Sequence, residues 1–168
     1  MSTINRRRFM GTTAAGALAL ASPMTFAAGP KRGGTMRIAM AHGNTVDTYD
    51  PAVWNNAFMQ FFSYSRCGYL TEILPNGSLN GELLESWEAS ADASTWTLKL
   101  RKGMEFHNGK TVTAEDVIAS LRYHQGEETK SAAKPIVAPI KDMKAPDAHT
   151  VVLSLEGGNA DLPFVLSD

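Results

Sequence analysis

Two segments in which apolar residues alternate with other residues constrain the fold of this chain more than any other feature. In Thr95–Leu100 and in Thr150–Leu155, every second residue is large and apolar. Because successive side chains of a strand point to opposite faces, each segment predicts a strand with one buried face. The first segment is expected to form a hairpin with residues 87–90, and the second with residues 136–144 through a turn at Pro146-Asp147.

Two helices are predicted beside these strands. Asn55 or Asn56 can cap the first helix, in which apolar residues recur at intervals of three and four. Thr113 and Asp116 form a variant capping box at the start of the second helix, which we expect to end by Gly126. The aromatic residues in and near the first helix are interpreted as core residues rather than as a ligand platform. They are Phe58, Phe61, Phe62 and Tyr69.

Shorter elements complete the expected organisation. Residues 35–40 alternate well enough for a first strand, and the loop that follows is rich in turn formers up to Asp50-Pro51. Residues 70–74 predict a short strand. The last residues, 161–168, begin a new apolar element without a cap, and we expect the natural protein to continue beyond them. Strands therefore dominate, and the expected fold class is mixed α+β.

Residues 1–27 are predicted to be an export signal rather than part of the fold. A basic stretch that ends at Arg8 leads into an apolar run of small residues, and we expect cleavage after Ala27, with Ala28 as the second choice. The apolar run is too short and too interrupted for a membrane span, which needs about 20 apolar residues. Arg6-Arg7 is typical of the twin-arginine export signal, and an ordinary arginine-rich secretory signal is the alternative.

Charge and cysteine content exclude several classes of protein. The chain has 16 basic and 17 acidic residues, and without the first 27 residues, which hold three arginines and no acid, 13 and 17 remain. A mildly acidic body does not favour binding to nucleic acid, so we expect no such partner. Cys67 is the only cysteine, which excludes an intrachain disulfide and a cysteine-based zinc or iron–sulfur site.

The residue types show no catalytic or metal-binding constellation. The four histidines are far apart in the sequence, and we expect no metal site and no cofactor. Glu82, Glu85 and Glu88 are spaced by three and could line a helix face, which keeps an exported carboxylate-dependent hydrolase as an alternative. The main expectation is an exported binding protein and not an enzyme.

Three motifs in order resemble the extracellular solute-binding proteins of the peptide/nickel class, family 5, which feed ABC importers. The motifs are Leu-Leu-Glu-Ser-Trp-Glu-Ala-Ser-Ala-Asp at residues 83–92, the segment from Trp96 to Gly109, and Thr-Ala-Glu-Asp-Val at residues 113–117. Residues 33–38 and Asp50-Pro51 resemble the family's opening strand and the Asp-Pro after it. The sequence departs from the family at two positions, which are Ala93, where the hairpin turn usually has Gly, and Tyr49, where Leu is commoner.

The resemblance implies a periplasmic-binding-protein fold of type II, present as the first strand, loop and helix of domain I (residues 28–66) and most of domain II (residues 67–168). It implies that Trp87, Trp96 and Phe106 belong to the core of domain II. It also implies a periplasmic, monomeric substrate-binding subunit. Such a subunit captures small peptides or related solutes by lobe closure and delivers them to a membrane permease.

Ligand contacts are expected, from the same resemblance, in the loop after the first strand and in the segment after Asp50-Pro51. The expected contact residues are Trp54, Asn55, Asn56, Ala57, His42 and Asn44. Trp54 could equally be a cleft wall or a packing residue, and Asn55 has a competing role as a helix cap. A metal complex, haem or a sugar is the alternative solute within the family.

Overall fold

The structure is a computed structural model that describes residues 32–167, so the predicted export signal lies outside the described residues. The chain divides into two units, Met1–Ile38 and Ala39–Asp168. The strand predicted at residues 35–40 is not formed, and Met36 is 84% exposed. An alternating pattern becomes a strand only when a neighbouring strand accepts its hydrogen bonds, and none of the described strands pairs with this segment.

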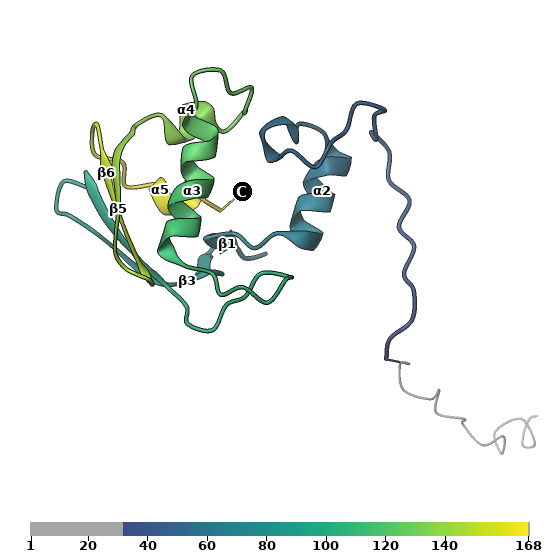
Figure 1. Cartoon of the computed structure of the whole chain (residues 1–168), viewed down its shortest axis with the longest axis horizontal. Coiled ribbons are helices and arrows are strands. Elements are labelled where there is room, and N and C mark those ends of the chain that lie inside the picture. The colour runs from purple at the N-terminus through teal and green to yellow at the C-terminus, as the bar shows by residue number, and fades with distance from the viewer. Residues whose placement is uncertain (1–31, 168) are drawn as a thin grey trace, which may run out of the picture. The chain divides into compact units, whose positions relative to one another are not determined.

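A four-stranded antiparallel sheet organises the second unit (Figure 1). The strand order is β3 (Leu84–Ala89), β4 (Thr95–Leu100), β6 (Thr150–Leu155) and β5 (Ile140–Asp147). Trp96 lies opposite Leu153 and Leu98 opposite Val151, so the alternating apolar residues share one face. Both predicted hairpins are confirmed, but the turn predicted at Pro146-Asp147 is wrong, because these residues end β5 and the chain turns at residues 148–149. The pairing of both edge strands, β3 and β5, is interrupted by register shifts.

The second hairpin begins later in the sequence than predicted. Lys134–Val137 form a short helix, α4, and β5 starts only at Ile140. Pro135 stands in the first turn of this helix, where a missing backbone N–H costs nothing, whereas in a strand it would remove a ladder hydrogen bond.

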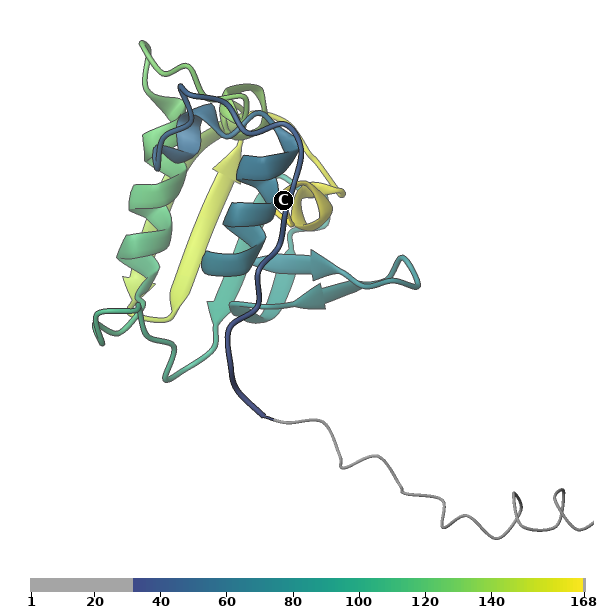
Figure 2. The same ribbon diagram turned by 90° about the vertical axis from the view of Figure 1, so that its right-hand side faces the viewer.

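Helix α3 (Ala114–Gln125) covers the apolar face of the sheet (Figure 2). Its capping box is confirmed, because the Thr113 backbone N–H donates to the Asp116 carboxylate at 2.9 Å. The helix ends at Gln125 with Gly126 as its C-cap, as expected. Its buried residues share one face and pack into the core; they are Ala114, Val117, Ile118 and Leu121.

Three aromatic residues, Trp87, Trp96 and Phe106, were expected in the core, and the structure shows a different degree of burial for each. Trp96 is buried, and Trp87 is half-buried against the core. Phe106 is 43% exposed, so its assignment to the core is wrong. The bridge from Glu105 to Thr111 places Phe106 on a small turn outside the sheet, where its ring contacts the Lys110 ammonium group at 5.6 Å from the centroid.

Five further elements lie before and after the sheet in the second unit. The short helix η1 (Pro51–Val53) precedes α2 (Ala57–Arg66). The strand predicted at residues 70–74 is confirmed as β1 (Thr71–Ile73), which pairs with β2 (Leu79–Gly81). Helix α5 (Leu162–Val165) follows the sheet, and its Pro163 carbonyl accepts a hydrogen bond of 2.6 Å from the buried Thr71 hydroxyl. None of the helices within residues 32–167 is long and apolar enough to cross a bilayer.

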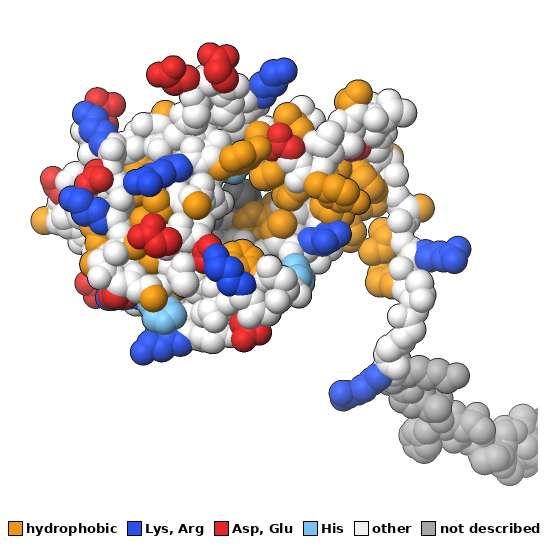
Figure 3. Space-filling model, in the orientation of Figure 1, with side chains coloured by type: hydrophobic (Ala, Val, Ile, Leu, Met, Phe, Trp, Pro, Cys, Tyr) orange, Lys and Arg blue, Asp and Glu red, His pale blue; other side chains and the backbone are white. Residues whose placement is uncertain are grey.

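The aromatic residues of α2 are more exposed than predicted. Phe58 and Phe61 are 38% and 40% exposed, and Phe62 is half-buried against Tyr49 and Trp54. Figure 3 shows apolar side chains gathered over this helix. The core interpretation is therefore wrong for Phe58 and Phe61. A period of three and four identifies an apolar face but does not tell which surface covers it.

We predict that Ala93→Gly stabilises the protein. Ala93 has a φ of 52° in the turn between β3 and β4, a backbone region in which a Cβ costs roughly 1–2 kcal/mol. Glycine removes this cost but adds freedom to the unfolded chain, so the expected gain in unfolding free energy is about 0.5–1 kcal/mol. Urea denaturation measures it. In the contrasting variant Gly158→Ala, the new Cβ would collide with the Asp92 carbonyl oxygen, so this variant should lose stability. A loss of stability in Ala93→Gly would contradict the interpretation that the Ala93 backbone is strained.

We also predict that the protein loses stability in acid because of Asp92, which lies in the same turn between β3 and β4. Hydrogen bonds from the Ser90 hydroxyl and then the Ser94 amide lower the pKa of Asp92 from 3.8 to about 2. A carboxyl with a lowered folded-state pKa contributes stability above its unfolded value, and this contribution is lost as the pH falls through the folded value. The Asp92 contribution should therefore disappear between about pH 4 and pH 2. Urea midpoints of wild type and Asp92→Asn should converge over that range, and parallel curves would contradict the assignment.

Candidate functional site

The loop before α2 is organised by the carboxylate of Asp47. Its Oδ2 accepts a hydrogen bond of 2.6 Å from the Asn44 backbone N–H, and its Oδ1 accepts one of 2.7 Å from the Asn56 side-chain amide. The Asn56 Oδ1 in turn accepts from the Met59 backbone N–H at 2.9 Å and caps α2. Of the two predicted caps, Asn56 is therefore the one that is used. Two of the predicted contact residues, Asn44 and Asn56, are held at fixed positions by one acidic side chain.

Trp54 packs within the same loop. Its indole Nε1 donates to the Thr48 carbonyl at 3.0 Å, and its ring meets Phe62 edge-on, with the centroids 6.0 Å apart. Both contacts are local, and the side chain is half-buried. These contacts favour the packing interpretation of Trp54 over that of a cleft wall.

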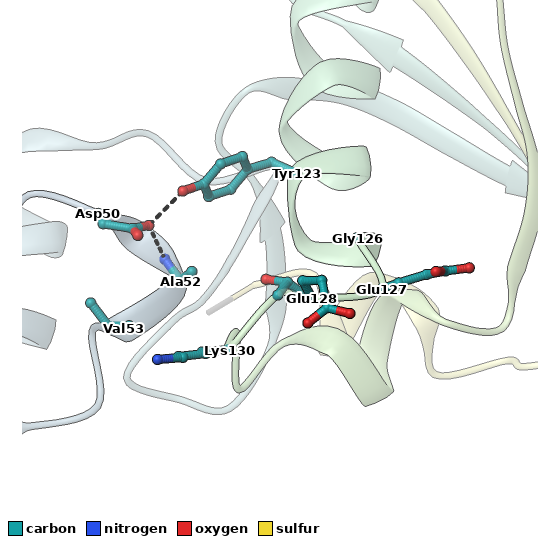
Figure 4. A pocket seen from close by; sticks show the side chains of 9 residues that line it. Asp50, Ala52, Val53, Tyr123, Gly126, Glu127, Glu128 and Lys130 are labelled. Carbon is teal, nitrogen blue, oxygen red and sulfur yellow. Dashed lines mark hydrogen bonds between the residues drawn. The ribbon is translucent and has the colours of Figure 1, made fainter.

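Asp50 connects the loop to α3. Its Oδ1 accepts hydrogen bonds from the Tyr123 hydroxyl at 2.7 Å and from the Ala52 backbone N–H at 2.9 Å. Figure 4 shows Asp50 and Tyr123 pointing toward each other from the two segments. The hydrogen bond from Tyr123, followed by that from Ala52, lowers the pKa of Asp50, and the same contact raises the pKa of Tyr123. The contact is thus strongest with Asp50 ionised and Tyr123 protonated.

Two pockets, each of about 550 Å³, lie beside this contact and share Asp50, Val53 and Lys130 in their linings. The first runs along the end of α3 and the segment after it, and is also lined by Ala52, Tyr123, Gly126, Glu127, Glu128 and Thr129. The second runs along the loop and is also lined by Asn44, Val46, Asp47, Thr48, Asn55 and Asn56. Together they form a groove between the loop and the end of α3, which we call the loop–α3 groove.

The loop–α3 groove contains half of the predicted contact residues. Asn44, Asn55 and Asn56 line it, whereas His42, Trp54 and Ala57 line neither pocket. The groove also contains residues that the sequence reasoning did not select. Among these, Asp47 could have been found from its position three residues after Asn44, which allows the local turn seen here. The presence of Tyr123 and Lys130 in the groove could not be predicted from the sequence, because only the fold brings them close to the loop. They come from the last turn of α3 and from the segment after it.

The groove is lined by both polar and apolar side chains. Within residues 32–167 no group of three or more His, Cys, Asp or Glu side chains could hold a metal ion. The helix face predicted for Glu82, Glu85 and Glu88 is not formed, because Glu85 and Glu88 lie on strand β3. Glu82 accepts a hydrogen bond from the Tyr69 backbone N–H at 3.0 Å. The helical spacing that grouped these three carboxylates in the sequence is therefore absent from the structure.

Comparison with known proteins adds a family assignment to this geometry. Residues 78–168 match the family described as bacterial extracellular solute-binding proteins, family 5, middle part. A Sinorhizobium fredii protein named "probable peptide ABC transporter periplasmic-binding protein y4tO" is 26% identical over 165 residues, which cover 98% of this chain and 30% of the relative. The "probable D,D-dipeptide-binding periplasmic protein DdpA" of Escherichia coli is 32% identical over 167 residues, which cover 95% and 31%. The chain therefore spans about a third of the length of these relatives.

A solved structure gives the same result for the fold. The binding protein MoaA of A. tumefaciens R10, in complex with mannopinic acid, superposes with a TM-score of 0.67 and 32% identity over 73% of this chain and 26% of that chain. The mixed α+β fold of the type II periplasmic binding proteins is thus confirmed, with this chain covering part of it.

We predict that Asn56→Ala destabilises the protein by about 1–2 kcal/mol, because it removes the cap of α2 and the bond to Asp47. Asn55→Ala is the matched control. Asn55 is exposed and is not the cap, so its replacement should change the unfolding free energy by less than about 0.5 kcal/mol. Urea denaturation of both variants tests the assignment, and equal losses would contradict it.

Proposed function

Since the chain belongs to the bacterial extracellular solute-binding proteins of family 5, we propose that it acts in the capture of a small peptide or related solute outside the cytoplasmic membrane and in its delivery to an ABC permease. The match of residues 78–168 to this family is the observation that carries the proposal. The names of both curated relatives, one for peptides and one for D,D-dipeptides, support a short peptide as the solute.

The solute binds in the loop–α3 groove. Asn55 presents a side-chain amide that neither caps α2 nor bonds Asp47, and Lys130 presents an ammonium group at the junction of the two pockets. Both groups suit carbonyl and carboxylate oxygens, which every peptide carries. Val53 adds an apolar wall to both pockets. Binding then favours a closed arrangement of the receptor through a higher affinity for that state, with no bond made or broken.

The proposal includes the route and the partners of the protein. Residues 1–27 act as a twin-arginine export signal, and the mature protein works as a monomer in the periplasm. We assign residues 28–66 to domain I and residues 67–168 to domain II. The membrane permease is the macromolecular partner, and nucleic acid is not.

A second solute class is favoured by one observation. The A. tumefaciens relative was solved with mannopinic acid, a non-peptide solute, at 32% identity to this chain. The hydrolase alternative is disfavoured, because the Tyr69 backbone N–H donates to Glu82, and Glu85 and Glu88 lie on strand β3 rather than on the helix face that grouped the three residues.

Thermal unfolding with three probes tests this function. The probes are D-alanyl-D-alanine, tri-L-alanine and mannopinic acid. A probe present at 100 times its Kd should stabilise the protein by about 2.7 kcal/mol, because it binds only the folded state. Mass spectrometry should recover that probe unchanged. Asn55→Ala, which we expect to retain its stability, should reduce the thermal shift. Consumption of a probe, or no shift with any of the three, would contradict the proposal.

A further inference from the structure

A hydrogen bond links the loop before α2 to helix α3, between two residues that are 73 positions apart in the sequence. The Tyr123 hydroxyl donates to the Asp50 Oδ1 at 2.7 Å. The two residues come from the last turn of α3 and from the N-cap of η1. Both line the first pocket of the loop–α3 groove, so the bond lies where the two walls of that groove meet.

The tyrosine is presented by a part of the molecule that is firmly anchored. Its helix packs four buried residues against the sheet, as described above. The two residues after Tyr123 hold the end of α3 in place. The Gln125 side-chain amide donates to the Val137 and Ile140 carbonyls at 2.7 and 2.8 Å. A ring nitrogen of His124 forms a hydrogen bond of 2.6 Å with the Ser131 hydroxyl. The position of the Tyr123 backbone is therefore fixed by core packing and hydrogen bonds.

The loop on the other side is held by polar contacts of two acidic residues, Asp47, as described above, and Asp50. The Asp50 carboxylate caps η1 through the Ala52 N–H, and the Asp50 backbone N–H donates to the Thr48 hydroxyl at 3.2 Å. The Thr48 carbonyl accepts from the Trp54 indole at 3.0 Å. A continuous series of bonds thus leads from Tyr123 through Asp50 and Thr48 to Trp54.

From this geometry we infer that Tyr123 is a positioning residue for solute binding. Acting through Asp50, its hydroxyl holds the loop of residues 44–56 at a fixed place beside α3 and so sets the width of the groove. The inference about affinity rests on the proposed function, whereas the inference about loop position does not.

Nuclear magnetic resonance of the three tryptophan indoles tests the loop position. Tyr123→Phe removes one oxygen and should shift the indole N–H resonance of Trp54, while those of Trp87 and Trp96, which belong to the sheet, stay in place. Tyr49→Phe is the matched control, because Tyr49 lies in the same loop and its ring, not its hydroxyl, contacts Phe62. Asp50→Asn keeps an acceptor oxygen for Tyr123 and Ala52 and should leave the Trp54 resonance close to its wild-type position, whereas Asp50→Ala should move it.

Affinity for D-alanyl-D-alanine tests the link to binding. Tyr123→Phe should weaken it by about three- to tenfold, the range expected for one hydrogen bond, and should lower the urea midpoint only slightly, because the bond is also present in the unliganded protein. In the Asp50→Ala background the same change should have no further effect, because its partner is already gone. An unmoved Trp54 resonance in Tyr123→Phe overturns the positioning role. A moved resonance with unchanged affinity overturns its link to binding. If the wild type binds no probe, the proposed function fails while the indole resonances still decide the loop position.

Discussion

The burial of one face of the sheet beneath α3 is the interaction on which the other features depend. Leu98, Val151 and Leu153 are fully buried between the central strands and this helix, and each such side chain stabilises the fold by roughly 1.5–3 kcal/mol. β4 and β6 are about 50 residues apart in the sequence but pair side by side, so the face that α3 covers exists only when both hairpins are formed. The end of α3, and with it Tyr123, takes its place from that packing.

The loop–α3 groove is stabilised by polar contacts at the surface rather than by burial of apolar side chains. Its walls are held by carboxylates at the protein surface, with Asp47 joining Asn44 to Asn56 and Asp50 joining η1 to α3. Exposed polar contacts contribute less than core packing, so this region belongs to the less stable part of the fold. That distribution fits the proposed function, because a surface that changes on binding must cost little free energy to rearrange.

The sequence was informative where local physics alone decides the structure. Period-two alternation was sufficient for β4 and β6, and the pairing of Thr113 with Asp116 was sufficient for the start of α3. It failed where a distant partner decides. Residues 35–40 alternate but have no neighbouring strand among the described residues, and Phe58 and Phe61 are apolar but only partly covered. The groove asparagines lie in the loop where the family resemblance led us to expect ligand contacts. Tyr123 could not be predicted in this way, because no pattern in the sequence around it indicates a contact with Asp50.

The irregular pairing of the two outer strands has a consequence for the behaviour of the protein at high concentration. β3 shifts register between Leu84 and Ser86, and β5 does so twice and carries Pro146 near its end. A bulged or proline-bearing border cannot offer an unbroken row of donors and acceptors to a strand from another molecule. These irregularities therefore disfavour growth into fibrils from either border of the sheet.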